Sequence, residues 1–218
     1  MNFYRFFKRA CDCTLSSFLL LVLSPLLILT FLLKYVEDFE NPLYTSKRVG
    51  LNGVVFRLYK VRSMAIGNHE QKHPTASKSS PITRLGKLLR RSKLDELPQL
   101  INIINGSMSF VGRRPDIIEI VNSDLYDETT KYIFKMKPGV TDIACLYFAD
   151  LTKLASNYED PHNFYKLNVW PIKKKLIRMH FENQSFISEF SILLATPFAI
   201  LFPSITRQFI SHKLNLKC

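Results

Sequence analysis

Two acidic residues stand side by side in the segment SKLDELPQL, which occupies positions 92–100. Asp95 and Glu96 precede Pro98, which opens a short apolar run. Carboxylates at such a place can cap the following helix, because the positive end of the helix dipole stabilises negative charge. They can also do chemistry, since carboxylates bind Mg²⁺ together with substrate phosphates and an aspartate can attack phosphorus. The residues alone leave the capping and the catalytic interpretations open.

Basic side chains near these acids favour an anionic substrate. Arginine binds phosphate through two parallel hydrogen bonds, and Arg62, Arg90 and Arg114 are candidates for that role. Lys60 and Arg62 share one face of an expected strand. The strand either ends in solvent or places both cations at a binding site, and both interpretations fit the spacing. The chain has no Walker A loop, no Gly-x-Gly-x-x-Gly and no Gly-x-Ser-x-Gly. We therefore expect phosphoryl chemistry outside the common nucleotide-binding and hydrolase folds.

An apolar segment near the N-terminus predicts contact with a membrane. Residues 18–33 read FLLLVLSPLLILTFLL, which is short for a plain spanning helix. No small-x-small cleavage site follows, so we expect the segment to be retained. Pro25 removes one helical hydrogen bond, which predicts a bend, and Ser24 can satisfy the backbone groups that the bend frees. A kinked transmembrane helix and a re-entrant helix that enters and leaves by the same face both fit this pattern.

The net charge of the chain limits the kinds of partner that it can bind. It carries 30 Lys and Arg against 18 Asp and Glu, a net charge of +12. Basic residues precede the apolar segment and also dominate the rest of the chain, so both sides favour the cytoplasmic face. Anionic lipid and a phosphorylated substrate fit this charge, whereas no nucleic-acid-binding motif is found. The four cysteines are scattered, which favours a reducing compartment.

Several elements are expected to position these residues. Two short strands should flank a turn at 50–53, and residues 65–83 read as a polar loop. A short amphipathic helix should carry Arg90, and a second should run from Gln99 to Asn105 with Gly106 at its end. The apolar stretch 191–205 contains two prolines and fits either the membrane interface or the core.

Together these features resemble the bacterial sugar transferases, monotopic enzymes that move a sugar phosphate from a nucleotide sugar to a polyprenyl phosphate. The resemblance runs along nearly the whole chain. It rests on six segments in order: the Ser24-Pro25 break, YKVRSM at 59–64, PITRLGKLLRRSKLDELPQLINIINGSMSFVGRRP at 81–115, KPGVT at 137–141, EDPHNFY at 159–165 and the Pro171 stretch.

The resemblance implies a specific site. Asp95 would attack the diphosphate of the nucleotide sugar, and Glu96 would assist as a magnesium ligand or proton acceptor. Mg²⁺ would be the cofactor, with Asp95 and Glu96 as its ligands. The substrate-binding residues would be Lys60, Arg62, Arg90, Arg114 and Thr141. The capping interpretation then remains only as a role that the acids share with catalysis.

Three positions depart from the family pattern. Ser107 stands where an aspartate is usual, Arg113 where a proline is usual, and Asp142 where a glycine is usual. None of them alters the Asp95-Glu96 pair. Ser107 and Arg113 change local charge, which bears on nucleotide or sugar preference, and Asp142 predicts a different backbone geometry in its turn.

We therefore expect an α+β protein with a re-entrant membrane helix over residues 1–40 and one small, mainly helical catalytic domain with a β-hairpin over 41–218. It would act at the cytoplasmic face of the bacterial inner membrane, transferring a sugar 1-phosphate from a UDP-sugar to undecaprenyl phosphate in exopolysaccharide, O-antigen or capsule synthesis. A nucleotide-sugar hydrolase and a non-catalytic membrane scaffold for glycan assembly are the alternatives. The oligomeric state, the sugar and the roles of the two acids stay open.

Overall fold

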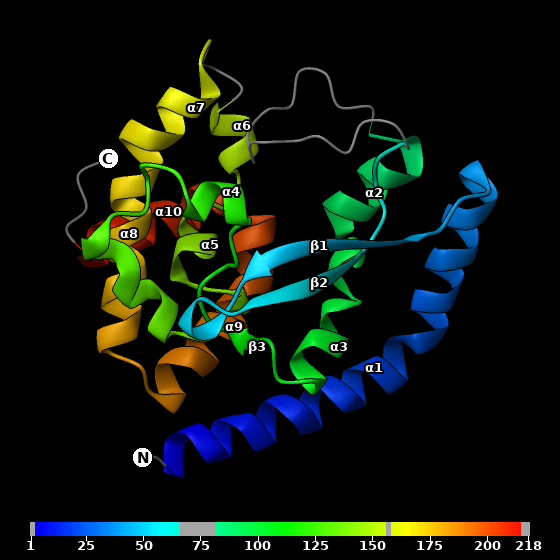
Figure 1. Cartoon of the computed structure of the whole chain (residues 1–218), viewed down its shortest axis with the longest axis horizontal. Helices are drawn as coiled ribbons and strands as arrows, with labels where there is room; N and C mark the ends of the chain where they lie inside the picture. The colour runs from blue at the N-terminus through cyan, green and yellow to red at the C-terminus, as the bar shows by residue number, and fades with distance from the viewer. Residues whose placement is uncertain (1–2, 66–81, 156–157, 215–218) are drawn as a thin grey trace.

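A long bent helix and a helical body with two small sheets make up the structure, a computed structural model that describes residues 3–65, 82–155 and 158–214 (Figure 1). The expected loop 65–83 lies mostly outside these residues. The strands are β1 (Leu43–Val49), β2 (Val55–Val61), β3 (Ser109–Val111) and β4 (Gly139–Thr141). The helices are α1 (Phe3–Asp38), α2 (Arg84–Ser92), α3 (Gln99–Ile104), α4 (Ile118–Val121), α5 (Ile143–Tyr147), α6 (Leu151–Ala155), α7 (Pro161–Phe164), α8 (Trp170–Glu182), α9 (Phe186–Leu201) and α10 (Pro203–Leu214). This mostly helical composition with short sheets agrees with the expected α+β class.

Helix α1 contains the apolar segment and bends partway along its length (Figure 1). Pro25 lies inside it, and the hydroxyl of Ser24 donates a 2.8 Å hydrogen bond to the Leu21 carbonyl. A proline inside a helix is a usual cause of such a bend. Within the described residues, α1 is the one helix long and apolar enough to cross a membrane by length and composition.

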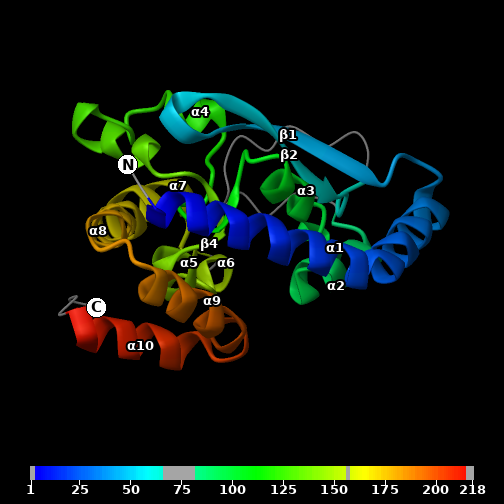
Figure 2. The same ribbon diagram turned by 90° about the horizontal axis from the view of Figure 1, so that it is seen from below.

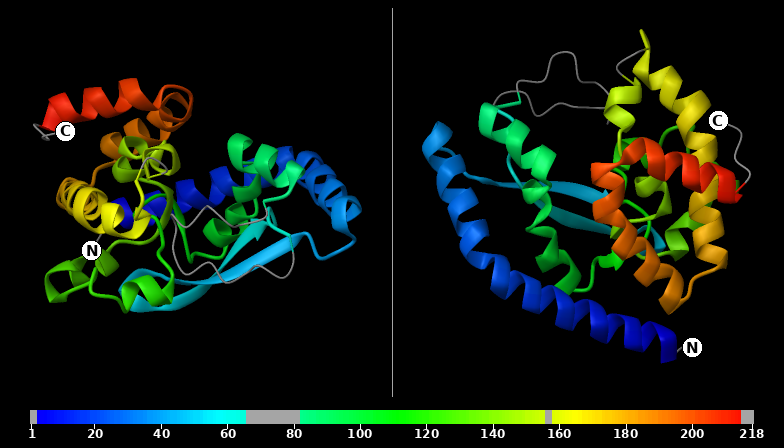
Figure 3. Two further views of the ribbon diagram at one scale, coloured as in Figure 1. Left: turned by 90° about the horizontal axis from the view of Figure 1, so that it is seen from above. Right: turned by 180° about the vertical axis from the view of Figure 1, so that it is seen from behind.

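Two hydrophobic clusters hold α1 against the body. Leu19 and Leu20 pack beside the cluster formed by Leu58, Leu100, Ile103 and Met108. Farther along, Leu27 is buried with Val61 and Leu89, which belong to β2 and α2. The helix therefore lies along α2, α3 and the hairpin instead of projecting away from them, as the views from below and from behind also show (Figures 2 and 3).

The two sheets are small and differ in type. Strands β1 and β2 form the expected antiparallel hairpin, with Tyr44 opposite Lys60. Strands β3 and β4 pair in parallel, with Val111 opposite Thr141. A Cβ atom on Gly139 of β4 would collide with the backbone of Gly112, and one on Gly112 would collide with the Lys137 carbonyl oxygen. Glycine at both positions allows the two segments to approach so closely.

The main core lies among the C-terminal helices. Trp170, Leu176 and Ile177 of α8 are buried there together with Leu146 and Tyr147 of α5. The apolar stretch 191–205 was expected either in the interface or in the core. It forms most of α9 and the start of α10, with Ile192 and Ala199 buried in this core and Leu194, Phe198 and Leu201 exposed. One side of the segment therefore belongs to the core, while its other side is exposed, and contact of that side with a membrane interface stays a prediction.

Candidate active site

Asp95 and Glu96 lie in a 3₁₀ turn, η2 (Leu94–Glu96), between α2 and α3. Asp95 is buried, with 6% of the residue exposed, and its Oδ1 atom has no hydrogen-bond partner in the described part of the chain. Helix α3 starts after Pro98 and receives no side-chain cap there. The acids therefore do not serve as caps for α3, and Asp95 holds a buried acceptor that the fold leaves unused.

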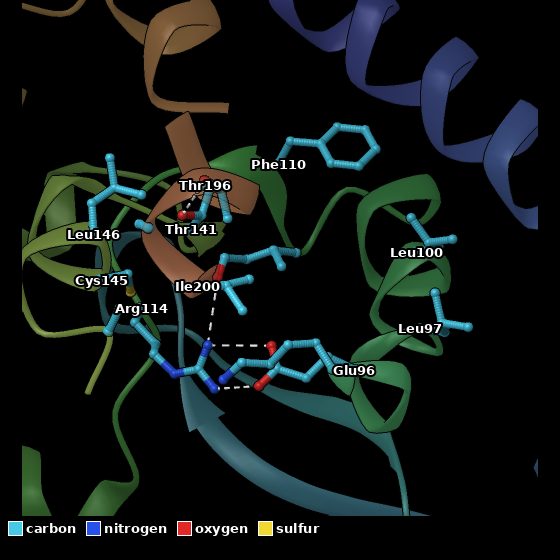
Figure 4. A pocket seen from close by; sticks show the side chains of 14 residues that line it. Glu96, Leu97, Leu100, Phe110, Arg114, Thr141, Cys145, Leu146, Thr196 and Ile200 are labelled. Carbon is cyan, nitrogen blue, oxygen red and sulfur yellow. Dashed lines mark hydrogen bonds and ion pairs between the residues drawn. The ribbon is translucent and has the colours of Figure 1, made fainter. Parts of the chain in front are cut away.

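Glu96 accepts hydrogen bonds from two cations that come from different parts of the chain, Arg114, drawn in Figure 4, and Lys60. Arg114 donates from Nη2 to Oε1 at 2.6 Å and from Nη1 to Oε2 at 3.3 Å. Lys60 Nζ donates to Oε1 at 3.0 Å. A two-pronged guanidinium contact fixes both the position and the plane of a carboxylate. Glu96 is thus held rigidly, in contrast to Asp95.

The hairpin and α3 bring Lys60 to Glu96. Asn102 of α3 is fully buried, and its side chain accepts from the Tyr59 amide at 3.0 Å and donates to the Arg57 carbonyl at 2.7 Å. The Asn102 side chain therefore makes the hydrogen bonds to the edge of β2 that a neighbouring strand would make. Because η2 directly precedes α3, fixing α3 against β2 also fixes Glu96 against Lys60.

Asp142 orients Arg114. Its buried carboxylate accepts from the Arg114 backbone amide at 3.1 Å and from the Cys145 amide at 2.5 Å, where it caps α5. Asp142 is an extended residue with φ −154°, a conformation that does not require glycine, and its side chain ties the segment after β3 to the start of α5. A turn geometry different from that of the family stays a prediction. Arg114 leaves that junction and points toward Glu96.

A pocket of about 230 Å³ opens beside Glu96 and Arg114 (Figure 4). Its other walls are largely apolar and come from η2, α3, β3, α5 and α9, including Leu97, Leu100, Phe110, Leu146 and Ile200. Thr141 and Thr196 face each other in it, with their hydroxyl oxygens 2.9 Å apart. The pocket therefore joins one charged wall to several apolar ones, as a site for an amphipathic or partly apolar ligand would.

Burial and neighbouring charges shift the pKa values of the two acids in opposite directions. Burial raises the pKa of Asp95 and the charge of Glu96 adds to the rise, although Lys60, Lys93 and Arg90 oppose it. Burial also acts to raise the pKa of Glu96, but Arg114 and Lys60 outweigh it and hold that pKa well below its usual range. Glu96 is therefore a stable anion, while the charge of Asp95 depends on the cations around it.

Cys145 also lines the pocket, but it is not a thiolate nucleophile. Burial raises the pKa of its thiol, and the neighbouring charge of Asp142 adds to that effect. A reactive cysteine requires the opposite, a pKa lowered by positive charge. Asp95, the predicted nucleophile, is not among the residues that line this pocket; it directly precedes Glu96, which is.

The carboxylate of Asp95 fits a magnesium ion better than that of Glu96. Mg²⁺ takes oxygen ligands and is commonly held by one or two carboxylates with substrate phosphates and water. The buried Oδ1 of Asp95 has no partner, whereas both oxygens of Glu96 already accept hydrogen bonds from cations. In the part of the chain that the structure describes, no three His, Cys, Asp or Glu side chains gather as a metal cluster.

The predicted substrate-binding residues divide into two groups. Lys60 and Arg114 both bind Glu96, while Thr141 lines the same pocket farther from Glu96 and faces Thr196. Arg90 lies near enough for its charge to act on Asp95, and its Nε donates to Ser63 Oγ at 2.8 Å. Arg62 is placed elsewhere. It is buried and makes two 2.8 Å hydrogen bonds to the carboxylate of Asp38 at the end of α1.

Two of the departures from the family pattern also lie away from the pocket lining. Arg113 is buried and donates to the carbonyls of Val49 and Gly50 at 2.8 and 2.9 Å, with its guanidinium over the Phe134 ring. Ser107 bonds to the Asn102 carbonyl and to the side chain of Asn105. In the structure both side chains serve the packing of neighbouring segments.

Sequence reasoning missed Lys93 and the contribution of α9. Lys93 lines the pocket and adopts a left-handed conformation with φ 60° between α2 and η2, two positions before Asp95. Thr196 is the one hydroxyl residue in the apolar run Ile192–Phe202, which was its only sequence signal. Ala199 and Ile200 gave none, because apolar residues in an apolar segment do not reveal which cavity they line.

Comparison with known proteins agrees with this architecture. Relatives include an undecaprenyl-phosphate galactose phosphotransferase of Salmonella typhimurium, 36% identical over 157 residues. A UDP-glucose:undecaprenyl-phosphate glucose-1-phosphate transferase of Escherichia coli is 34% identical over 141 residues, and the exopolysaccharide production protein ExoY of Sinorhizobium fredii is 33% identical over 153.

These matches cover 64%, 63% and 62% of this chain but only 32%, 30% and 66% of the respective relatives. The chain thus spans about a third of the length of the first two. The family described as bacterial sugar transferase matches residues 3–203, which include α1, both sheets and the acidic pair. This match confirms the resemblance inferred from the motifs, and the chain belongs to the bacterial sugar transferase family.

Proposed function

We propose that this protein transfers a sugar 1-phosphate from a UDP-sugar to undecaprenyl phosphate through a covalent phospho-aspartate on Asp95. The reaction would be the first membrane step in the synthesis of a surface polysaccharide or glycoconjugate. The relatives named as undecaprenyl-phosphate sugar phosphotransferases support the substrate class. The observation that carries the proposal is the buried, unpartnered oxygen of Asp95 beside a glutamate held between two cations.

The first half-reaction uses Asp95 as nucleophile. One carboxylate oxygen attacks the phosphorus that bears the sugar, and the bond between that phosphorus and the oxygen bridging the two phosphates breaks. The electron pair leaves with the nucleoside monophosphate, and the sugar phosphate stays bonded to Asp95. Splitting one transfer into two displacements is the general advantage of covalent catalysis.

The second half-reaction restores the enzyme. A phosphate oxygen of the polyprenyl phosphate attacks the same phosphorus and displaces the Asp95 carboxylate. The product is a polyprenyl diphosphate sugar. Arg114 and Lys60 would stabilise negative charge on the phosphates, because both are already aligned at the Glu96 side of the pocket.

When bound, Mg²⁺ would neutralise part of the diphosphate charge and so favour the leaving group. Asp95 would hold it, together with oxygens of the substrate. Glu96 remains a predicted second ligand or proton acceptor. In this structure its contacts support a different contribution, which is to fix the guanidinium of Arg114 toward the phosphates.

We also propose a re-entrant α1, with the catalytic domain on the cytoplasmic face. Near its start, Arg9 donates to the carbonyls of Ile103 and Ile104 at the end of α3. Near its end, Asp38 pairs with Arg62 beside the hairpin. Both ends of α1 thus bind the same compact body, which supports entry and exit by one face of the membrane. The division into residues 1–40 and 41–218 stays a prediction.

The test is a transfer assay with purified protein, Mg²⁺, a panel of radiolabelled UDP-sugars and undecaprenyl phosphate. We expect a lipid-linked product with at least one donor, and we expect Asp95→Asn to abolish it. Asp124→Asn is the matched control, because Asp124 is an exposed aspartate paired with Lys166 away from the pocket. Release of water-soluble sugar phosphate without lipid product would instead identify a hydrolase, and the absence of turnover would favour the scaffold.

A further inference from the structure

A second cavity, of about 600 Å³, lies between the first half of α1 and α9. We call it the α1–α9 groove. Its apolar walls are formed by Leu15 and Phe18 of α1, Phe110 of β3, and Phe186, Phe190 and Leu193 of α9. Phe7 and Phe186 meet with ring centroids 5.7 Å apart, which adds an aromatic contact between the two helices.

The charged side chains that line the groove are paired with protein groups. Lys8 forms an ion pair with Glu189 and also donates to the Val111 carbonyl at 3.2 Å. Asp12 accepts from Ser109 Oγ at 2.7 Å. Lys8 and Asp12 are thus engaged with protein groups, while Oε1 of Glu189 has no hydrogen-bond partner among the described residues, so the groove offers no free cation to an anionic ligand. The groove is therefore suited to an uncharged, apolar chain.

The groove and the candidate active site share one lining residue. Phe110 lines both the groove and the pocket that contains Glu96 and Arg114. In Figure 4 its ring lies on the side of the pocket that faces α1. A long apolar ligand in the groove could thus place a polar end beside Arg114 while its tail remained against α1 and α9.

We propose that the α1–α9 groove holds the isoprenoid chain of the polyprenyl phosphate acceptor, next to its phosphate end. This inference rests on the proposed function. The stretch of α1 from Lys8 to Phe18 is about 15 Å long at the rise of an α-helix, enough for several isoprene units. The headgroup phosphate of a phospholipid fits less well, because Lys8, the one lysine or arginine among the described groove-lining residues, is already paired with Glu189.

Filling the groove tests the proposal kinetically. Leu15→Trp would add bulk at a groove-lining, partly exposed position, so we expect KM for undecaprenyl phosphate to rise about tenfold. KM for a short prenyl phosphate of two isoprene units should rise less, because a shorter chain occupies less of the groove. Leu21→Trp is the control, since Leu21 is an exposed leucine of the same helix outside the groove. Equal KM changes in both variants, or none, would overturn the proposal.

Photolabelling of the unaltered protein in nanodiscs separates this inference from the proposed function. With a diazirine-bearing polyprenyl phosphate, we expect labelled peptides from residues 10–18 and 186–193, and protection by undecaprenyl phosphate. Equal protection by phosphatidylglycerol would make the groove a general lipid site and overturn the inference, as would labelling elsewhere or a protein–protein contact over the groove. Labelling of the groove without any sugar transfer would leave the groove assignment standing and reject the function.

Discussion

Asp95 and Glu96 are adjacent in the chain but meet different surroundings. Glu96 accepts hydrogen bonds from Arg114 and Lys60, while Asp95 keeps a buried oxygen without a partner. A carboxylate that is already bonded on both oxygens is a poor nucleophile, because its lone pairs are engaged. In the proposed mechanism the two acids would divide the work, with Glu96 organising the cations and Asp95 reacting.

The pH dependence of transfer should depend on Lys93. Attack requires the carboxylate form of Asp95, so kcat/KM falls as pH drops through its pKa, which burial raises. Lys93 opposes that rise, so Lys93→Met should raise the pKa further and move the acid limb of the profile to higher pH. Rates measured from pH 5 to 8 check this. Lys87→Met, the same change at an exposed residue of α2, should leave the limb in place, and identical limbs in both variants would contradict the expectation.

At the scale of elements, α1 is fixed by polar contacts at both ends and by apolar contacts between them. Arg62 was expected to bind substrate, but its guanidinium lies against Asp38, and its Nε donates to the Asn41 carbonyl at 2.8 Å. Lys34 of α1 is fully buried and forms ion pairs with Glu37 and with Asp38, the same aspartate that binds Arg62. This cluster joins the end of α1 to the end of β2.

Arg62→Met should therefore lower the stability of the protein strongly and change binding of the UDP-sugar only slightly. Removing one partner of a largely buried ion pair costs several kcal/mol, and because Asp38 is partly exposed we expect about 1–3 kcal/mol. That corresponds to a fall in Tm of about 2–12 °C for a chain of this size. Thermal unfolding in detergent provides the measurement, and KM for the UDP-sugar should stay within about twofold.

The control for this variant is Arg178→Met. Arg178 pairs with Glu182 one turn along α8, and both side chains are more than half exposed. Such pairs contribute little, so Tm should hardly change. If Arg62→Met instead raised KM strongly while leaving Tm unaltered, Arg62 would act on the substrate and the contact with Asp38 would be incidental.

At the scale of the whole molecule, three helices, α1, α9 and α10, expose large apolar side chains. They include Phe18, Leu21 and Val22 of α1, Leu194, Phe198 and Leu201 of α9, and Ile205 and Phe209 of α10. Patches of this kind mark contact with a membrane or a partner. With a net charge of +12, the surface also favours anionic lipid.

Cysteine access should show both ends of α1 on one side of the membrane. In a chain whose four native cysteines are replaced, single cysteines at Phe3 and at Lys47, both exposed, report on the start of α1 and on the hairpin beyond it. A membrane-impermeant thiol reagent should label both in inverted inner-membrane vesicles and neither in right-side-out spheroplasts. Labelling from opposite faces would show that α1 spans the bilayer.

The sequence by itself determined the features that depend on neighbouring residues. Strand alternation and the glycine turn predicted the hairpin, and Pro98 and Gly106 marked the limits of α3 within a residue or two. The apolar run with Pro25 predicted a long helix with an interruption. Each of these follows from local backbone preference and hydrophobic pattern, and the ordered motifs were sufficient to identify the family.

The tertiary structure alone decided which charges meet. Glu96 binds Lys60 and Arg114, which are 36 and 18 positions away, while Arg62 turns to Asp38. With 30 lysines and arginines in the chain, pattern gives no means of choosing among such pairs. The choice depends on packing: Asn102 fixes α3 against β2, and Asp142 fixes Arg114 beside α5. Contacts between distant segments exist only after the core has formed, so local sequence cannot specify them.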